Sequence, residues 1–221
     1  TGLEATPTRT IYTFQGEGVC LTLTFMTPAL PDDLEGLWRP VTYLTYQSAA
    51  VDNRPHEVQI YFDASAEIAV NDKNQECGWA EEIINRDLRT LKVGSKPQPT
   101  LAKKGDDLRI DWGYFYIASP QAITLGQPGV AVPGAAAGAF AAVGLQFINN
   151  VMTPPEMPAS ALALSVFFDA GRVSTKPVSR WLMLAYDDEY SIKYFRQNLR
   201  PYWRRQGDDG PALLKKAAAG Y

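Results

Sequence analysis

The segment from Glu57 to Val70, EVQIYFDASAEIAV, restricts the fold most strongly because apolar and polar residues alternate along it. Its even-numbered positions are all apolar and its odd-numbered positions are mostly polar, so an extended chain would have one dry face. At about 3.4 Å per residue such a strand spans roughly 40 Å, about twice the usual length. The pattern therefore predicts a large β-sheet.

A second β-rich run, RPVTYLTYQSAA at residues 39–50, precedes this segment. Residues 51–55 between the two runs supply turn formers and a proline. We therefore expect residues 39–50 and 57–70 to form a long antiparallel hairpin.

Further strands are expected on both sides of this hairpin. Residues 10–14 and 19–25 alternate around a Gly-rich turn and predict an opening hairpin, followed by one helical turn or a loop at 32–35. The other predicted strands lie within 108–117, 161–168 and 178–186, with 169–172 joining the last two. Residues 81–93 fit either a helix or strands, and we favour strands. The strand at 108–117 has large side chains on both faces, which is typical of a central or covered strand. Together these segments predict an all-β fold, a large antiparallel β-sandwich.

The stretch from 119 to 160 is rich in Pro, Gly and Ala, and only PGAAAGAFAAVGLQF at 133–147 is suited to a short helix. An insert of this length in a compact domain usually covers something or is mobile.

After Tyr186 the pattern changes to helical spacing. Asp187 or Asp188 is a candidate cap for a helix on which Ile192, Phe195 and Leu199 recur, and Asp209 precedes a second helix over PALLKKAAA at 211–219. We therefore predict a β-sandwich domain at residues 1–187 and a helical linker at 188–221 that leads to a downstream helical domain.

Composition excludes several classes of partner. The 221-residue chain has a net charge of −3, so it has no basic field for nucleic acid. No apolar run approaches the roughly 20 residues of a membrane helix. We expect neither nucleic acid nor a membrane as a partner.

The residues that usually hold metals or act as nucleophiles are few. The only histidine, His56, falls at the turn of the predicted hairpin, where we expect a solvated side chain. No clustered ligand spacing is present, so we predict no metal and no cofactor. Cys20 and Cys77 are expected to be free thiols, and a disulfide between them stays open if the protein is exported.

No residue can be assigned a catalytic role from the sequence. QECGW at 75–79 is similar to a thiol-protease active-site run, but a glycine separates Cys77 from the tryptophan, so we expect a loop cysteine. No Gly-x-Ser-x-Gly elbow exists. Most carboxylate pairs are typical of turns and caps; Asp187, Asp188 and Glu189, at a predicted strand end, are candidates for a site.

The tail combines aromatic residues with arginines, the residue types that dominate interface hot spots. We expect an interdomain contact, with packing against the chain's own sheet as the alternative. The candidate interdomain or cleft-facing residues are Asp187, Asp188, Tyr190, Tyr194, Arg200, Tyr202 and Trp203. Trp112 and Tyr114 are candidates for a sugar or amide site or, more simply, for the core.

Two long segments resemble the N-terminal domain of the glutaminase A family, which comprises secreted or periplasmic proteins. They are LWRPVTYLTYQSAAVDNRPHEVQIYFDASAEIAVN at 37–71 and KPVSRWLMLAYDDEYSIKYFRQNLRPYWRRQGDDG at 176–210. Residues 8–35 and the strand DWGYFYIA at 111–118 resemble the same domain. The resemblance implies an extracellular or periplasmic location and a β domain that precedes a larger helical part, an α/α toroid, in an enzyme that hydrolyses L-glutamine.

The resemblance transfers no catalytic residue to this chain. The leading hypothesis is therefore a non-catalytic domain that docks onto a helical domain of the same glutaminase-like protein and helps to shape a small-molecule site between them. Two alternatives stay open: the β-sandwich domain of a glycoside-processing enzyme, and a free-standing carbohydrate- or protein-binding module.

Overall fold

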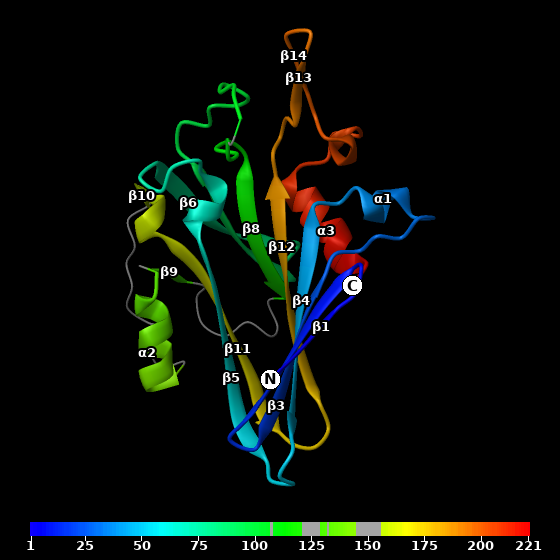
Figure 1. Cartoon of the computed structure of the whole chain (residues 1–221), viewed down its shortest axis with the longest axis vertical. Helices are drawn as coiled ribbons and strands as arrows, with labels where there is room; N and C mark the ends of the chain where they lie inside the picture. Colours follow the sequence, from blue (N-terminus) through cyan, green and yellow to red (C-terminus); the bar gives the residue numbers. More distant parts are fainter. Residues whose placement is uncertain (107, 121–128, 132, 145–155) are drawn as a thin grey trace.

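The computed structural model describes residues 1–106, 108–120, 129–131, 133–144 and 156–221. Within them the chain is an all-β sandwich of a larger and a smaller antiparallel sheet, as the sequence predicts (Figure 1). The larger sheet has the strand order β1-β2-β3-β4-β12-β8-β7-β6-β10, and the smaller one has the order β5-β11-β9.

The strands of the larger sheet are β1 (Gly2–Ala5), β2 (Arg9–Gly16), β3 (Val19–Met26), β4 (Val41–Ala50), β6 (Glu76–Ile84), β7 (Leu88–Ser95), β8 (Tyr114–Pro120), β10 (Glu156–Pro158) and β12 (Val178–Asp187). Those of the smaller sheet are β5 (His56–Ser65), β9 (Gly129–Ala131) and β11 (Ala163–Val173). A separate hairpin pairs β13 (Ile192–Tyr194) with β14 (Gln197–Leu199). The helices are α1 (Leu34–Leu37), α2 (Ala135–Val143) and α3 (Gly210–Ala219), with short 3₁₀ turns η1 (Ala66–Ala69), η4 (Ala159–Ala161) and η5 (Tyr202–Arg204).

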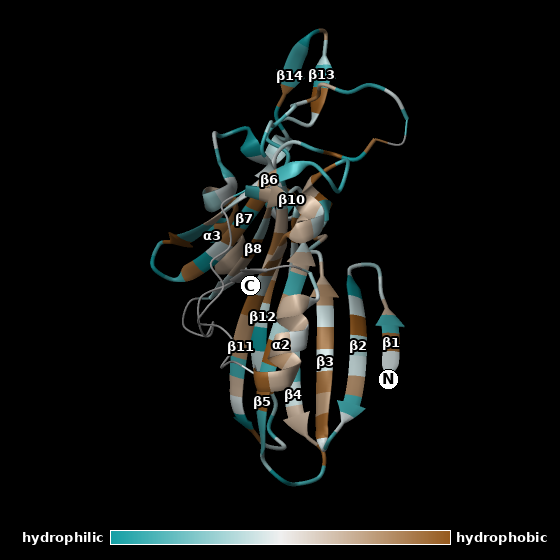
Figure 2. Ribbon diagram, turned by 90° about the vertical axis from the view of Figure 1, so that its left-hand side faces the viewer, coloured by the Kyte–Doolittle hydropathy of each residue, from teal (hydrophilic) through white to brown (hydrophobic). Residues whose placement is uncertain are grey.

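The main core lies between the two sheets. β4 and β12 contribute Leu44 and Leu182 from the larger sheet, and β11 contributes Leu164 and Phe168 from the smaller one. On the far side of the smaller sheet, α2 packs its Phe140 against Tyr61 of β5, with ring centroids 5.3 Å apart (Figure 2). The smaller sheet is therefore covered on both faces, which explains why β11 is buried almost throughout its first half.

A second core covers the outer face of the larger sheet. There α3 and η5 bury Leu213, Leu214 and Trp203 against Tyr43 and Met183. The Tyr43 hydroxyl donates a 2.8 Å hydrogen bond to the backbone oxygen of Ala217, which fixes α3 on the sheet. The C-terminal helix is thus an integral layer of this domain. No helix in the described part of the chain is long and apolar enough to span a membrane.

The predicted hairpin of residues 39–50 and 57–70 is wrong, because its two strands belong to different sheets. β4 pairs with β3 and β12, whereas β5 pairs with β11. The turn at 51–55 therefore crosses from one layer of the sandwich to the other. The connection between β11 and β12 crosses in the same way at residues 174–177, and the predicted turn at 169–172 lies within β11.

The strand beginning at residue 57 is also shorter than expected. The Ser65 side chain accepts a hydrogen bond from the Glu67 amide at 3.2 Å and starts η1. Ala66 and Ala69 are buried at the three-residue spacing of a 3₁₀ turn, while Ile68 is exposed. Small alanines fit either spacing, so the alternation was a weak signal there.

The strand predicted at 108–117 begins only at Tyr114. Gly113 has a φ of +78°, and a β-carbon on it would lie 2.2 Å from the backbone oxygen of Asp187. Only glycine fits this close approach. Its positive φ interrupts the extended backbone at residue 113, so the strand begins after it.

The helix predicted around Ile192, Phe195 and Leu199 is wrong, since these residues form the β13–β14 hairpin. Its two-residue turn is Phe195 and Arg196, both at positive φ, as a type I′ connection requires. The hairpin projects into solvent, so an apolar helical face there would have had nothing to pack against.

The other predicted elements are confirmed. They are the opening hairpin, the turn of helix after Asp33, the strands within 81–93, the short helix in the insert and the final helix capped by Asp209. Residues 121–128 and 145–155 of the predicted insert lie outside the described residues.

We predict that Leu214→Ala in the second core lowers the free energy of unfolding by about 2–5 kcal/mol, because a buried leucine leaves a cavity. Val143→Ala, on the exposed side of α2, is the control and should change stability by less than about 0.5 kcal/mol. Urea unfolding followed by tryptophan fluorescence measures both. Equal effects would show that α3 does not contribute a core.

Candidate functional site

The predicted site residues gather at one end of the sandwich, where β12 ends and β8 begins. The β13–β14 hairpin, η5 and α1 all lie at this end, the upper end in Figure 1. The β13–β14 hairpin and η5 follow β12 directly in the chain. The end of this central strand therefore determines where both elements begin.

A buried ion pair joins the last residue of β12 to η5. Asp187 is 1% exposed, and its carboxylate accepts hydrogen bonds from Nε, at 2.9 Å, and from Nη2 of Arg204. Arg204 is itself buried. Burial acts to lower the pKa of the Arg204 guanidinium, but the hydrogen bond to Asp187 and its charge outweigh burial and hold this pKa above its ordinary value. A third hydrogen bond to Asp187, donated by the Glu189 amide at 3.0 Å, fixes the start of the following turn.

Hydrogen bonds to backbone groups build the rest of this end. The Trp112 indole donates to the Tyr190 backbone oxygen at 3.0 Å, and the Tyr186 hydroxyl donates to the Trp112 backbone oxygen at 2.7 Å. Gln98 contacts both backbone groups of Gly113 through its side-chain amide. These contacts hold the half-buried Trp112 and Gly113 in place directly before β8.

A second buried carboxylate, Asp111, lies in the same region and is also neutralised. It accepts hydrogen bonds from Lys103 and, at 3.2 Å, from Gln75. Burial raises the pKa of the neighbouring Tyr186 hydroxyl, and the charges of Asp188 and Asp111 add to this shift. Because Asp187 and Asp111 are both held by cations, neither is arranged as a free general acid or base.

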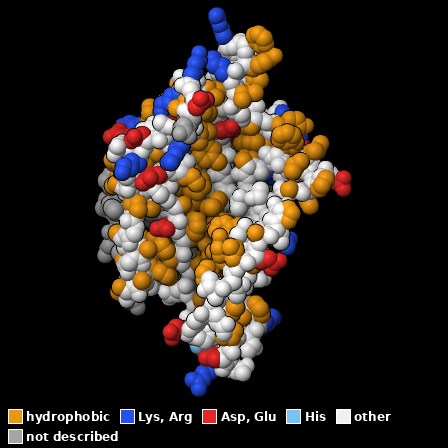
Figure 3. All heavy atoms as spheres, in the orientation of Figure 1, with side chains coloured by type: hydrophobic (Ala, Val, Ile, Leu, Met, Phe, Trp, Pro, Cys, Tyr) orange, Lys and Arg blue, Asp and Glu red, His pale blue; other side chains and the backbone are white. Residues whose placement is uncertain are grey.

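An exposed apolar surface extends from this end. We call it the aromatic end surface, and it consists of Leu34, Leu37, Trp38, Ile192, Tyr194, Phe195, Leu199 and Tyr202. Figure 3 shows hydrophobic side chains at the tip of the molecule and at its upper right, over the hairpin and α1. The Trp38 and Tyr202 rings are 5.1 Å apart, and Arg205 pairs with Glu35, so α1 and η5 form one unit.

The predicted site residues divide between the interior and this surface. Tyr194, Tyr202 and Arg200 are exposed, and the Arg200 guanidinium lies 5.3 Å from the centre of the Tyr190 ring. Asp188 is half-buried and accepts a hydrogen bond from Ser191.

Trp203, by contrast, is buried in the second core, so the packing alternative is correct for this residue. The sequence did not reveal Leu34, Leu37 and Trp38 as part of the surface. Three apolar residues in one short helical turn after a proline-rich loop were the available signal.

The possible nucleophile Cys77 is buried in β6, not in a loop, and both cysteines are free thiols. Burial raises the pKa of the Cys77 thiol to about 11, which disfavours the reactive thiolate. His56 lies at the opposite end of the sandwich, and its Nε2 is 2.9 Å from Asp52. Among the described residues, no three His, Cys, Asp or Glu side chains are grouped as metal ligands would be.

Tyr114, the other aromatic residue considered for ligand binding, lines a hollow of about 400 Å³ in the larger sheet. The Lys92 ammonium lies 3.7 Å from the centre of its ring, and Lys96 and Glu156 stand at the edge. Gly78 and Gly94 also line the hollow, and their lack of side chains leaves space beside the Tyr114 ring.

The chain is similar to proteins of three kinds. A family model described as "Domain of unknown function (DUF5127)" matches residues 8–221. Glutaminase A of Aspergillus oryzae (strain ATCC 42149 / RIB 40) is 29% identical over 120 residues, which are 54% of this chain and 17% of that protein. A solved structure described as "Putative kojibiose phosphorylase from human microbiome" superposes with a TM-score of 0.43 at 9% identity, over 96% of this chain and 21% of that chain. The chain spans about a fifth of the length of either protein.

We predict that Arg204→Met lowers the free energy of unfolding by about 3–5 kcal/mol, because it leaves Asp187 buried without its cation. The double variant Asp187→Leu with Arg204→Met should recover much of this loss, since no unpaired charge stays buried. A double-mutant cycle by urea unfolding measures the coupling. Additive losses would show that the two residues do not act as a pair.

We also predict that a thiol reagent such as dithionitrobenzoate labels the partly exposed Cys20 rapidly in the native chain at pH 8 and leaves Cys77 unmodified. Urea should make Cys77 reactive, and Cys20→Ser supplies the control. Fast labelling of Cys77 in the folded Cys20→Ser variant would contradict its assignment as a core residue.

Proposed function

The chain belongs to the DUF5127 family, and we propose that it is a non-catalytic β domain of a glutaminase-like amidohydrolase that docks onto a helical domain of the same protein. The observation that carries this proposal is the aromatic end surface. We take the proposed reaction, the hydrolysis of an amide, from the similarity to Glutaminase A.

The number of exposed aromatic and aliphatic side chains at this end of the domain favours a surface that binds a partner over one that stays in solvent. Soluble proteins rarely leave large apolar patches in water, and those that they leave are usually interaction sites. The neighbouring Arg196, Arg200 and Arg205 give the surface the mixture of aromatic residues and arginines that is typical of hot spots.

The tip of the hairpin supports the same interpretation. Phe195 is 82% exposed and has a φ of +44°, a conformation that is strained for a bulky residue. Gly or Asn would suit this turn better, and neither would present a ring to solvent. A strained, exposed aromatic residue is consistent with a contact made outside this chain.

The arrangement of reactive groups favours an accessory role. Amide hydrolysis needs an activated nucleophile or water and a proton donor close to it. In the described residues, His56 and Cys77 lie apart, and the buried carboxylates near the aromatic end surface are paired with Arg204 and Lys103. The downstream domain would therefore supply the chemistry, and this surface would form one wall of the site between the two domains.

We predict that this chain alone releases no ammonia from L-glutamine, whereas a longer polypeptide that includes the downstream region does. A coupled glutamate dehydrogenase assay on equal concentrations of both proteins measures the difference. Turnover by the chain alone would refute the accessory role.

Release of sugar from an oligosaccharide by the longer polypeptide, without ammonia release, would instead favour the second candidate, a glycoside-processing enzyme. The hollow beside Tyr114 is the feature of this chain that would suit a sugar.

We further predict that Trp38→Ser combined with Phe195→Ser weakens docking in the longer polypeptide and leaves the fold of this chain intact, because both side chains are at least half exposed. The rate of proteolytic cleavage between the domains should rise at least about tenfold, the effect expected from loss of one hot spot. Ile83→Ser, at a 48% exposed position on β6, is the matched control. Equal cleavage of the two variants would argue against docking through this surface.

A further inference from the structure

A row of four residues crosses the outer face of the larger sheet at the hollow beside Tyr114. Glu156 on β10 pairs with Gly78 on β6, and Gly78 pairs with Gly94 on β7. The Tyr114 ring of β8 stands directly beside Gly94, since a β-carbon on that glycine would lie 2.7 Å from the ring. The floor of the hollow is therefore the bare backbone of two neighbouring strands, with a carboxylate on one side and an aromatic ring on the other.

The two glycines of this row differ in what requires them. Glycine inside a strand weakens it and often marks the close approach of another backbone or of a ligand. Gly94 meets such an approach within the chain, because a β-carbon on it would lie 2.6 Å from the backbone oxygen of Gly113.

Gly78 meets no such approach in the part of the chain that the structure describes. Beyond its two chain neighbours, a β-carbon on it would have no described atom within 4 Å. Its φ is not positive, and the strand pairing on both sides of it is regular. We therefore interpret Gly78 as a point where a ligand comes close to the backbone.

A positive charge stands at one end of the hollow. Lys92 lies two residues from Gly94 along β7, and its side chain is half-buried. Its ammonium is 3.7 Å from the centre of the Tyr114 ring, and it has no carboxylate partner among the described residues. The contact with the ring holds the ammonium in place without neutralising it. This end of the hollow therefore suits a ligand carboxylate.

The opposite end of the hollow has an excess of negative charge. Lys96 pairs with Glu156 and lies 3.6 Å from Glu76, so two carboxylates share one ammonium. One carboxylate charge is left over at this end, which suits a ligand ammonium.

From these charges we infer that the hollow beside Tyr114 binds a free α-amino acid, whose carboxylate contacts Lys92 and whose ammonium contacts the carboxylates at the other end. Lys92 and Glu156 are two strands and two residues apart, so their α-carbons are separated by about 12 Å at about 4.8 Å per strand and 3.4 Å per residue. A zwitterion with a hydrogen bond of about 2.9 Å at each end fits within this span, and the two side chains cover the remainder. The volume of about 400 Å³ also lies within the usual range of small-molecule sites.

Other small ligands fit only one part of the hollow. An anion would bind Lys92 but would face the excess carboxylate charge at the other end, and a cation would meet Lys92. A sugar ring would need the face of Tyr114 for stacking, and the Lys92 ammonium already lies over that ring. A ligand with one charge of each sign satisfies both ends at once.

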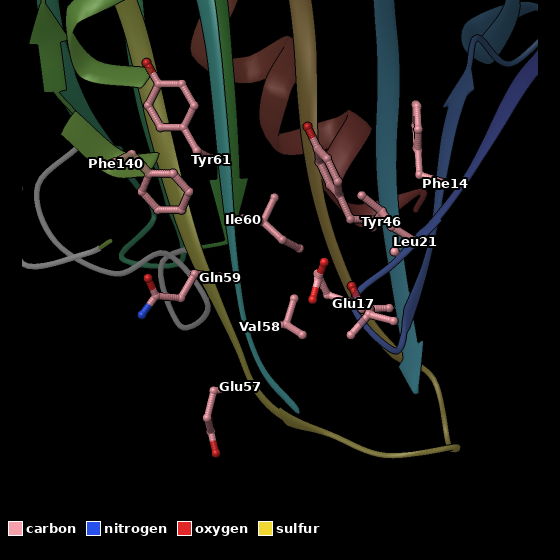
Figure 4. Close-up of a pocket in the computed structure, with 13 residues that line it drawn as sticks. Phe14, Glu17, Leu21, Tyr46, Glu57, Val58, Gln59, Ile60, Tyr61 and Phe140 are labelled. Atoms are coloured by element: carbon pink, nitrogen blue, oxygen red, sulfur yellow. The ribbon is translucent and has the colours of Figure 1, made fainter. Parts of the chain in front are cut away.

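A larger groove at the other end of the sandwich lacks this combination of charges. It has a volume of about 520 Å³ and lies between β5 on one side and β2, β3 and β4 on the other. Figure 4 shows Val58 and Ile60 pointing from β5 toward Tyr46, while Glu57 points away. The described residues that line this groove include no lysine or arginine. A zwitterion would find no partner for its carboxylate there, so the hollow beside Tyr114 is the better site.

The inference does not depend on the proposed reaction, because it needs only this chain and its charges. It places an amino acid on the outer face of the larger sheet and not at the aromatic end surface. Only the choice of L-glutamine as the probe rests on the proposed function.

Calorimetric titration of the chain with L-glutamine tests the inference. Because Lys96 and Glu156 are about half exposed, we expect saturable binding with a Kd on the order of 1 mM. N-acetyl-L-glutamine lacks the ammonium charge, and the α-amide of L-glutamine lacks the carboxylate. Each should bind at least about tenfold more weakly, the effect of losing one hydrogen bond to a charged group.

Three results would overturn the inference. They are the absence of saturable L-glutamine binding, equal affinity for N-acetyl-L-glutamine, which would show an anion site, and binding of maltose without L-glutamine, which would show a sugar site. A longer polypeptide that releases no ammonia would leave these titrations unchanged, so the inference and the proposed function can fail separately.

A variant of the positive end provides a second readout. Lys92→Met should weaken L-glutamine binding at least about tenfold, because it removes the partner of the carboxylate and keeps the hydrocarbon part of the side chain beside Tyr114. Lys176→Met, at an exposed position between β11 and β12, is the matched control and should leave the affinity unchanged. Equal affinities of the two variants would contradict the inference.

Gly78→Ala separates ligand binding from folding. A methyl group at this position meets no described atom, so the melting temperature should not fall, whereas L-glutamine should bind at least about tenfold more weakly. Unchanged affinity would show that no ligand approaches Gly78. A lower melting temperature would show that the fold itself requires this glycine. Either result would remove the basis of the inference.

Discussion

Burial on both faces of the central strands is the constraint on which the rest of this structure depends. β4 and β12 direct Leu44 and Leu182 into the main core and Tyr43 and Met183 into the second core. Strands that are apolar on both faces need two covering layers, so the smaller sheet and α3 are both required. The crossings from β4 to β5 and from β11 to β12 follow, because the chain must leave the larger sheet to build its own cover.

The Asp187–Arg204 pair connects this framework to the segment that carries the candidate surface. It joins the end of a central strand to η5, and η5 contacts α1 through Tyr202 and Trp38. A buried pair of this kind is weak evidence for stability but sets orientation, because either ion alone would be costly in the interior. Thus Asp187, one of the three neighbouring carboxylates that the sequence singled out, is paired with Arg204 inside the domain and positions η5.

Part of the candidate site was readable in the sequence and part was not. Tyr194, Arg200 and Tyr202 stood out by residue type, since arginines and aromatics in a tail are typical of interfaces. Trp203 has the same character but is buried, because only packing against the larger sheet distinguishes it from its neighbour. The assignment of β4 and β5 to different sheets depends on which strands pair, and no local pattern reports pairing over such distances.

The sequence by itself determined most of the longer strands and the all-β class, because alternation, glycines, prolines and capping residues act within a few residues of one another. Only the tertiary structure decided that adjacent strands part into different sheets and that α3 belongs to the domain. It also decided that Phe195 and Arg196 turn a hairpin where the spacing suggested a helix. The reason is that burial is a property of distant contacts: a segment whose apolar residues fit two periodicities takes the one that leaves fewer of them in water.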